Sequence, residues 1–308
     1  MSASIRLGLV GLGKIARDQH LPSVAVTEGI ELVAVASRNA AAEGIANYPD
    51  LHAMLAGEPD LDAIVLCQPP QARFEAARMA LAAGKHVFLE KPPGATVSEA
   101  QALVSLAAQQ GVTLFASWHS RYASAVAAAK LWVATHTLKR VTIEWKEDVR
   151  HWHPGQDWIW EPGGFGVFDP GINALSILTE VINTPVRLID AQLETPVNRQ
   201  APIAARLAME TAAGVPIAAE FDWRQTGPQT WDIIIEAEEG MLCLANGGNT
   251  LMINGAPCET GQEAEYPGLY RRFVELIGAG ISDVDLAPLQ LVADAFMRGE
   301  LRSTAAFL

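Results

Sequence analysis

A short glycine-rich run near the N-terminus constrains the fold of this chain more than any other feature. Alternating apolar residues over positions 5–10 are typical of a buried parallel strand, and they lead into the sequence GLGKIA at 11–16. In this G-x-G-x-x-A pattern, Gly11 permits a tight turn, Gly13 lets the backbone approach a pyrophosphate, and Ala16 lets the next helix pack on the strand. The pattern therefore predicts a dinucleotide-binding turn.

The elements around this turn occur in the order that a dinucleotide site requires. A helix is expected over 17–27, and its free N–H groups and positive dipole end attract phosphate. Lys14 and Ile15 stand where the turn enters this helix, and we expect both to contact the cofactor. Because a second strand follows at 31–36, the motif is a much stronger signal than the bare pattern.

The composition excludes several classes of partner. Half of the residues are hydrophobic, so the chain is globular, and 308 residues suffice for two domains with their own cores. A formal net charge of −13 argues against a nucleic acid or an anionic membrane as partner, since both attract basic surfaces. Local groups must then hold an anionic cofactor.

The cysteines and the N-terminus indicate the compartment. Cys67, Cys243 and Cys258 are few, odd in number and without the spacing of a metal site, so we expect a reduced, cytoplasmic protein and no bound metal. No basic and apolar leader opens the chain. The uncharged stretch 100–120 is long enough for a membrane span, but polar residues interrupt it, and it divides into a helix and a strand.

The first 120 residues repeat strand and helix, which is typical of a doubly wound parallel sheet. Gly84 is expected to end one helix, and Thr96 and Glu99 form the pattern of a capping box that opens another. Pro92 and Pro93 end a strand because proline has no N–H group for the ladder. Strands are predicted at 63–67, 87–89 and 112–116, and helices at 51–55, 71–83 and from about 97 to 111.

Beyond about residue 121, runs of strands follow a few helices, as in an α+β domain with one large, mainly antiparallel sheet. The sequence therefore predicts an α/β protein. It has an N-terminal Rossmann dinucleotide-binding domain (1–120) and a C-terminal α+β domain (121–308) for substrate binding and homo-oligomerisation, with a dimer expected through the broad sheet. Helices are predicted at 124–134, 170–182, 269–279 and 288–298, and strands at 141–146, 187–193, 204–210, 215–221, 231–237 and 241–245.

The end of the second strand bears on the choice of cofactor. An acidic residue there binds the adenosine ribose and excludes a 2′-phosphate, but this strand continues into Ser37, Arg38 and Asn39. Ser37 can donate a hydrogen bond, and Arg38 can pair with a phosphate or stack on adenine. We therefore expect NADP to be accepted, with NAD also possible. The alternative is that Arg38 is an ordinary surface residue.

Ligands of open α/β sheets bind outside the carboxyl ends of the strands, and three segments are predicted to lie there. Lys91 follows a buried strand and is turned aside by two prolines, so its ammonium is placed to orient a hydroxyl or carbonyl. The alternative is that Glu90 and Lys91 form an ordinary ion pair at a strand end. The candidates at these strand ends are Cys67, Gln68 and Pro69, then Glu90 and Lys91, and then His119.

A tryptophan-rich segment between 145 and 161 also contains histidines and carboxylates. Indole rings cover the C–H faces of a sugar, while acidic and histidine side chains bind its hydroxyls, so this composition suits an uncharged polyhydroxylated ligand. Some of these tryptophans must instead be core residues. The histidines lie in a predicted loop without the spacing of a metal site. The predicted sugar contacts are Glu147, Trp152, His153 and Trp231, with His119 as a weaker candidate.

The sequence around Asp169 has two explanations. Asp169 fits the N-cap position of a helix and Pro170 its first turn, which explains both residues structurally. Asn173 lies four residues further on, so it shares a helix face with Asp169. Taken alone, the capping explanation is preferred.

Together, these residues carry a resemblance to a known family. The G-x-G-x-x-A start, the Glu90-Lys91-Pro92 run and the pattern GG-x4-D-x-G-x-N at 163–173 resemble the glucose–fructose oxidoreductase/inositol dehydrogenase/rhizopine catabolism (Gfo/Idh/MocA) family over essentially the whole chain. Within it, residues 11–22, 118–121 and 152–156 are similar to those of bacterial NAD(P)-dependent L-arabinose/D-galactose 1-dehydrogenases. The resemblance implies oxidation of a cyclic aldose (D-galactose, L-arabinose or D-fucose) at C1 to the aldonolactone.

The resemblance also implies roles for individual residues. It places Lys91 beside the reacting hydroxyl and Asp169 as a polar partner on the other domain, with the sugar bound between the domains. Many members of the family have a histidine four residues after the aspartate, where this chain has Asn173, an amide that cannot take up a proton. Asn173 is then a reader of sugar hydroxyls, and the base is Asp169 or Lys91.

Two other functions remain in view. A cyclitol dehydrogenase acting on an inositol is disfavoured by the missing histidine. A dinucleotide-binding sensor without turnover is disfavoured by the presence of both Lys91 and Asp169.

Overall fold

The computed structural model describes residues 4–262 and 264–308. The chain divides into two compact units. Unit 1 comprises Met1–Trp118 and Tyr266–Leu286, and unit 2 comprises His119–Glu265 and Ala287–Leu308. The predicted domains, 1–120 and 121–308, assigned residues 266–286 to the second domain, whereas this segment packs in unit 1.

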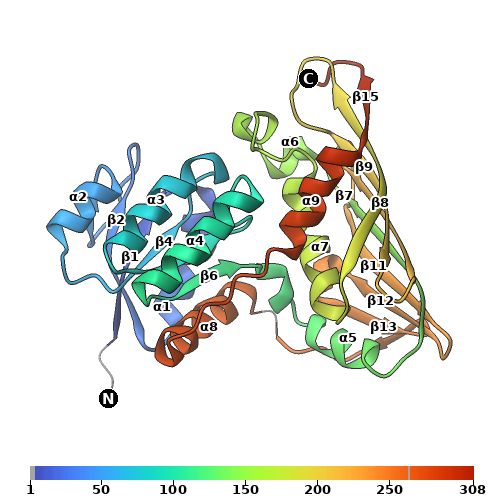
Figure 1. Cartoon of the computed structure of the whole chain (residues 1–308), viewed down its shortest axis with the longest axis horizontal. Coiled ribbons are helices and arrows are strands. Elements are labelled where there is room, and N and C mark those ends of the chain that lie inside the picture. Colours follow the sequence, from blue (N-terminus) through green and yellow to red (C-terminus); the bar gives the residue numbers. More distant parts are fainter. Residues whose placement is uncertain (1–3, 263) are drawn as a thin grey trace. The chain divides into compact units, whose positions relative to one another are not determined.

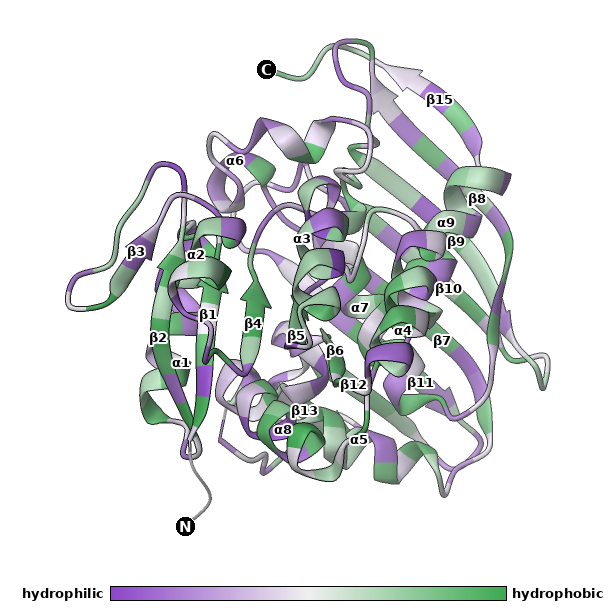
Figure 2. Cartoon of the chain, turned by 60° about the vertical axis from the view of Figure 1, so that its left-hand side comes forward, coloured by the Kyte–Doolittle hydropathy of each residue, from purple (hydrophilic) through white to green (hydrophobic). Residues whose placement is uncertain are grey.

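Unit 1 is built on a six-stranded parallel sheet with the order β3-β2-β1-β4-β5-β6 (Figure 1). The expected Rossmann sheet is confirmed, and the glycine turn follows its first strand. Figure 2 shows β4 as an almost continuous hydrophobic strand, as expected for a strand covered on both faces. The strands are β1 (Ile5–Val10), β2 (Ile30–Ala36), β3 (Ala46–Tyr48), β4 (Ala63–Leu66), β5 (His86–Glu90) and β6 (Leu114–Ser117).

The helices of unit 1 begin and end where the capping residues predict. Thr96 and Glu99 form a complete capping box at the start of α4, and Gly111, in the left-handed conformation at φ 66°, ends it. The helix after the glycine turn differs from the prediction because its middle is a five-residue π-helix, Ala16–His20. The remaining helices are α1 (Leu21–Val26), α2 (Leu51–Gly57), α3 (Pro70–Ala82), α4 (Val97–Gln110) and α8 (Glu265–Ala279).

Helix α8 belongs to unit 1 because its aromatic face packs on the parallel sheet. Tyr270 stacks on Phe88 of β5 with ring centroids 5.2 Å apart, and Phe273 stacks on Phe115 of β6 at 6.1 Å. Tyr270 and Phe273 are fully buried. Aromatic pairs stabilise a fold by more than the area that they bury. These contacts therefore hold α8 on the parallel sheet, although the residues that directly precede it in sequence belong to unit 2.

Unit 2 is built on a nine-stranded sheet with the order β14-β13-β12-β11-β7-β10-β9-β8-β15. The pairs β7–β10 and β8–β15 are parallel and all other neighbours are antiparallel, which confirms a mainly antiparallel sheet. Strands β13, β14 and β15 were not predicted. The strands are β7 (Leu138–Lys146), β8 (Val186–Pro196), β9 (Ala204–Thr211), β10 (Pro216–Asp222), β11 (Thr230–Ala237), β12 (Met241–Ala245), β13 (Thr250–Ile253), β14 (Ala256–Cys258) and β15 (Glu300–Thr304).

Helices α5 (Val126–Val133), α7 (Phe168–Val181) and α9 (Ala287–Arg298) lie along one face of this sheet (Figure 1). Along β7, buried Val141 and Ile143 alternate with Thr142 and Glu144, which are half-buried and exposed. Figure 2 shows the same alternation of hydrophobic and hydrophilic residues along the neighbouring strands. The period of two places one set of side chains against the helices and the other toward the opposite face. Among the described residues, no helix is long and apolar enough to cross a membrane.

The N-cap prediction for Asp169 is wrong. Helix α7 begins earlier than expected, with Val167 as its N-cap, so Asp169 lies inside the first turn. The N-cap position, whose side chain would accept the free N–H groups of the first turn, is instead occupied by Val167. Asp169 itself is only 5% exposed. Helix capping therefore does not explain Asp169, which favours a functional role for this residue.

Gly166→Ala is expected to destabilise the start of α7 by about 3 kcal/mol or more. Gly166 has φ +54°, and an added Cβ would lie 2.3 Å from the carbonyl oxygen of Pro202. Gly155→Ala is the matched control, since Gly155 has φ +69° but no described atom within 4 Å of its Cβ position. We expect it to cost about 1 kcal/mol. Urea unfolding of both variants measures the difference, and equal stabilities would contradict the prediction.

Candidate functional site

The loops after β1 and β4 form a glycine cradle in unit 1. Gly11 has φ +93°, and an added Cβ would lie 3.1 Å from the backbone nitrogen of Gln68 and 3.2 Å from the carbonyl carbon of Cys67. At Gly13 no described atom lies within 4 Å of the Cβ position, and the residue is exposed. The backbone is therefore tight at the first glycine and open at the second, which fits a bound pyrophosphate. Pro69 follows this loop as the N-cap of α3.

The other predicted cofactor contacts near β1 and β2 are exposed or half-buried. Arg38 is exposed and Ser37 is half-buried just beyond β2, where the Ser37 N–H donates to the carbonyl of Tyr48 over 2.9 Å. Lys14 forms an ion pair with Asp18 one helical turn on, at the surface. Ile15 is 37% exposed. The side chains of Ser37 and Arg38 thus stand at the strand end where an acidic residue would select NAD.

The loop after β5 carries Lys91, which is half-buried. The preceding residue, Glu90, is 4% exposed, and its Oε2 accepts the backbone N–H of Lys91 over 2.9 Å. Glu90 therefore supports the loop from within the protein. The guanidinium of Arg73, 3% exposed on α3, donates to the carbonyls of Glu90, Pro92 and Gln68.

Unit 2 contains a cluster of acidic side chains held by indole and imidazole groups. Glu147 is 3% exposed, and its two carboxylate oxygens accept the Nε1–H groups of Trp223 (3.3 Å) and Trp231 (2.9 Å). His153 Nε2 lies 3.7 Å from Oε1 of Glu147 and 3.7 Å from Oδ2 of Asp169. The predicted residues Glu147, His153 and Asp169, which are separate in sequence, are thus brought together.

Aromatic rings line the same part of unit 2. Trp152, 38% exposed, packs on Trp231 with ring centroids 5.2 Å apart, and Trp231 stacks on Trp145 at 6.0 Å. His153 packs against Trp223 at 5.3 Å. Trp145 and Trp223 are buried core residues, whereas Trp152 presents its ring to the surface. This arrangement places an exposed indole beside buried carboxylates, as a sugar site requires.

The two remaining predicted sugar contacts have different surroundings. Asn173 is half-buried on α7, four residues after Asp169, and its backbone carbonyl accepts the hydroxyl of Ser176 over 2.7 Å. His119 lies in the short helix His119–Tyr122, and its Nδ1 is 2.6 Å from a carboxylate oxygen of Glu265. Asn173 stays with the Asp169 cluster on its helix. His119 is held by a different partner.

Three residues that hold the site were not predicted. Trp223, Arg73 and His20 are each at most 3% exposed, and each hydrogen-bonds a predicted site residue. A charged residue within the alanine-rich helix 70–82 was a usable signal for Arg73. No such signal marked Trp223 or His20, because the residues that they hydrogen-bond, Glu147 and Glu90, lie 76 and 70 residues away in sequence.

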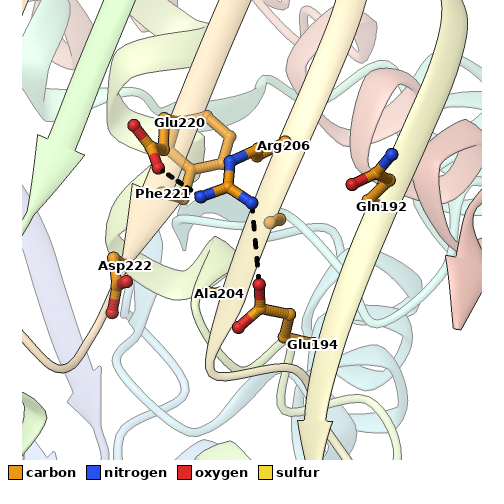
Figure 3. A pocket seen from close by; sticks show the side chains of 8 residues that line it. Gln192, Glu194, Ala204, Arg206, Glu220, Phe221 and Asp222 are labelled. Atoms are coloured by element: carbon orange, nitrogen blue, oxygen red, sulfur yellow. Dashed lines mark hydrogen bonds and ion pairs between the residues drawn. The ribbon is translucent and has the colours of Figure 1, made fainter. Parts of the chain in front are cut away.

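Two cavities of the described structure lie away from these residues. Figure 3 shows one on the nine-stranded sheet, where Arg206 is ion-paired with Glu220 (2.9 Å) and Glu194 (3.7 Å). Its volume of about 10 Å³ holds one water. A second, about 630 Å³, lies in unit 1 between α1 and the loop after β2. Within residues 4–262 and 264–308, no group of three or more potential ligands is placed to hold a metal ion.

Comparison with known proteins gives a consistent result. Residues 5–117 match the model of an oxidoreductase family with an NAD-binding Rossmann fold, GFO_IDH_MocA. The chain is 47% identical over 303 residues to galactose 1-dehydrogenase of Pseudomonas fluorescens, covering 98% of both chains. It is 58% identical to the crystal structure of D-galactose-1-dehydrogenase from Rhizobium etli, with a TM-score of 0.96 and coverage of 100% and 99%.

A more distant structure shares the fold alone. KijD10, a 3-ketoreductase from Actinomadura kijaniata solved with TDP-benzene and NADP, is 17% identical, with a TM-score of 0.83 and coverage of 98% and 99%.

Proposed function

Because this chain belongs to the Gfo/Idh/MocA oxidoreductase family, we propose that it is an NAD(P)-dependent aldose 1-dehydrogenase. It oxidises C1 of a cyclic sugar of the galactose type (D-galactose, L-arabinose or D-fucose) to the aldonolactone. The full-length likeness to two galactose 1-dehydrogenases carries this proposal. The three sugars share their configuration at C2 to C4 and differ at C5, which a pocket discriminates weakly.

We assign cofactor binding to unit 1. The tight turn at Gly11 and the open approach at Gly13 fit a pyrophosphate, as argued above from the Cβ positions. Bound there, NAD(P) supplies the acceptor for the hydride that leaves C1 of the sugar. The remaining assigned contacts are Lys14, Ile15, Ser37, Arg38, Cys67, Gln68, Pro69, Glu90 and Lys91.

We assign sugar binding to unit 2. The Glu147 carboxylate is held by two indole N–H groups, so it is fixed in place to accept sugar hydroxyls. Trp152 and Trp231 offer ring faces for the C–H surface of a pyranose. Asn173 and His153 add hydrogen-bonding groups, and His119 is a further candidate.

We assign Asp169 as the base that takes the proton of the C1 hydroxyl. This carboxylate is nearly buried, and His153 lies between it and Glu147. The Nε2 atom of His153 is thus within ion-pairing distance of both carboxylates. Lys91 is assigned to stabilise the charge on the reacting oxygen. Overall, C1 loses a hydride and the hydroxyl loses a proton, which leaves the lactone carbonyl.

The first experiment follows reduced-cofactor absorbance with D-galactose, L-arabinose, D-fucose and myo-inositol, each with NADP and NAD. We expect reduction with the aldoses and not with myo-inositol. Turnover of the inositol alone would favour a cyclitol dehydrogenase. Tight dinucleotide binding without turnover of any sugar would favour a sensor. Either result would overturn the proposal.

Arg38→Ala is expected to raise KM for NADP about tenfold or more and to leave KM for NAD within about twofold, because an Arg–phosphate contact exists only with the 2′-phosphate. Arg38 is exposed at the end of β2 beside Ser37. Arg17→Ala is the control, since Arg17 is also exposed in unit 1 but donates to the carbonyl of Ala41 over 3.4 Å. Parallel losses for both cofactors would remove Arg38 from the phosphate site.

We also propose a cytoplasmic homodimer. The three cysteines form no disulfide, which agrees with a reducing compartment. The sheet face shown in Figure 3 carries side chains of both charges, such as Arg206, Glu194 and Glu220, so two copies can present complementary groups to each other. Light scattering coupled to gel filtration measures the mass, and a monomer at micromolar concentration would contradict the dimer.

A further inference from the structure

Three charged side chains are buried beneath the loop that carries Lys91. His20 is 0% exposed, Arg73 3% and Glu90 4%. Charged residues are almost never buried to this degree without partners that compensate for lost hydration. Of the three, the function proposed above assigns only Glu90, as a cofactor contact, so the burial of His20 and Arg73 needs another explanation.

Arg73 holds the backbone on both sides of Lys91. Its Nη1 donates to the carbonyls of Glu90 and Pro92, and its Nη2 donates to the carbonyl of Gln68 in the loop after β4. One side chain thus joins the loops that follow two neighbouring strands. These three acceptors are neutral backbone carbonyls.

Glu90 holds the Lys91 backbone directly. Its Oε2 accepts the Lys91 N–H over 2.9 Å, while its Oε1 accepts from His20 Nε2 and from the Tyr266 hydroxyl, each over 3.0 Å. The second ring nitrogen of His20, Nδ1, is 2.7 Å from the hydroxyl of Tyr270. His20, whose ring has a cationic form, therefore hydrogen-bonds the Glu90 carboxylate directly.

We propose that His20 and Glu90 form a permanent buried ion pair which, with Arg73, fixes the Lys91 backbone, so that His20 is a positioning residue for the reaction. This inference rests on the proposed function of Lys91. A carboxylate removed from water requires a nearby cation, and breaking such a pair by removing one partner leaves an uncompensated charge.

The surroundings of His20 favour its charged form. Burial disfavours the imidazolium, but the neighbouring Cys67 and Glu90 outweigh this and raise the pKa of His20 to about 10. The other groups facing the ring are Tyr266, with its centroid 5.0 Å away, and Tyr270, whose pKa is raised well above its usual range by burial. The Tyr270 phenol is therefore a neutral hydroxyl near pH 7.

The protonation state can be measured without cofactor or sugar. In ¹⁵N spectra of the full chain, we expect both ring nitrogens of His20 to stay protonated from pH 6 to pH 9, and the pKa of the ring to fall in Glu90→Gln. His86 is the internal control, because burial lowers its pKa. Titration of His20 near the ordinary pKa of about 6.5 would overturn the ion pair, whatever the enzyme's activity.

Activity then tests positioning. His20→Gln is expected to lower kcat at least about tenfold with the sugar KM within about twofold, because the sugar-binding side chains belong to unit 2. His20→Gln/Glu90→Gln, which removes both charges, is expected to recover most of the loss. The control His86→Gln should keep wild-type kcat, since its described hydrogen bond is to Thr113. A double variant as slow as the single one would contradict the proposal.

Combination with Lys91→Met separates this inference from the proposed function. If His20 acts through Lys91, adding His20→Gln to Lys91→Met should lower kcat by less than about twofold. Independent, multiplying losses would overturn the positioning role. Normal turnover of Lys91→Met would instead remove Lys91 from the mechanism, while the ¹⁵N result would still decide the ion pair.

Discussion

Asp169→Asn is expected to lower kcat by about 10²–10⁴-fold while KM for the sugar changes by less than about fivefold. An amide keeps the shape of the carboxylate and one of its acceptor oxygens, but it cannot accept the C1 hydroxyl proton at neutral pH. Asp169 is 5% exposed and lies inside the first turn of α7 without capping it, so its conversion to an amide should leave the helix intact. Steady-state kinetics with D-galactose and the preferred cofactor measure the effect.

Asp157→Asn is the matched control, because Asp157 is an exposed aspartate in the short helix Asp157–Trp160 of the same unit. It should retain wild-type kcat. Near-normal turnover of Asp169→Asn would remove this residue as the base. Thermal melts of both variants show whether any loss reflects unfolding.

Lys91→Met is expected to lower kcat by about 10²–10³-fold, since the thioether keeps the length of the chain and removes the charge that stabilises the reacting oxygen. Cofactor binding, measured by quenching of tryptophan fluorescence, should weaken by less than about tenfold. The Lys91 backbone stays held through its N–H by Glu90 and through the flanking carbonyls by Arg73. The variant therefore isolates the ammonium.

Lys85→Met is the control for removing a lysine from unit 1, because the Lys85 ammonium is exposed and donates to the carbonyl of Pro59. If kcat for Lys91→Met equals that of this control, Lys91 does not stabilise the charge on the reacting oxygen. If Lys91→Met proves slower than Asp169→Asn, and Asp169→Asn keeps near-normal turnover, Lys91 rather than Asp169 is the base. The variants decide this better than a wild-type pH–rate profile, because such a profile does not assign its pKa values to individual residues.

Local patterns were sufficient for most of the parallel sheet of unit 1, although its short strand β3 was not predicted. The glycine turn, the capping box at Thr96 and the alternating strands predict the parallel sheet because each depends on interactions within a few residues. The short strands β13, β14 and β15 escaped prediction. They contain three to five residues, and their pairing depends on partners in the sheet more than on their own pattern.

The glycine turn, the Rossmann sheet and the residue types suited to a sugar were predictable from the amino-acid sequence. The three-dimensional structure was needed to show that Glu147, His153 and Asp169 lie in one cluster, that two indoles hydrogen-bond Glu147, and that α8 packs in unit 1. It also decided that Asp169 lies inside its helix rather than at the cap. Turns and caps depend on contacts between residues that are close in sequence, so a local pattern predicts them. The hydrogen-bond partners of buried carboxylates come from strands and loops that are distant in sequence, so no local pattern predicts them.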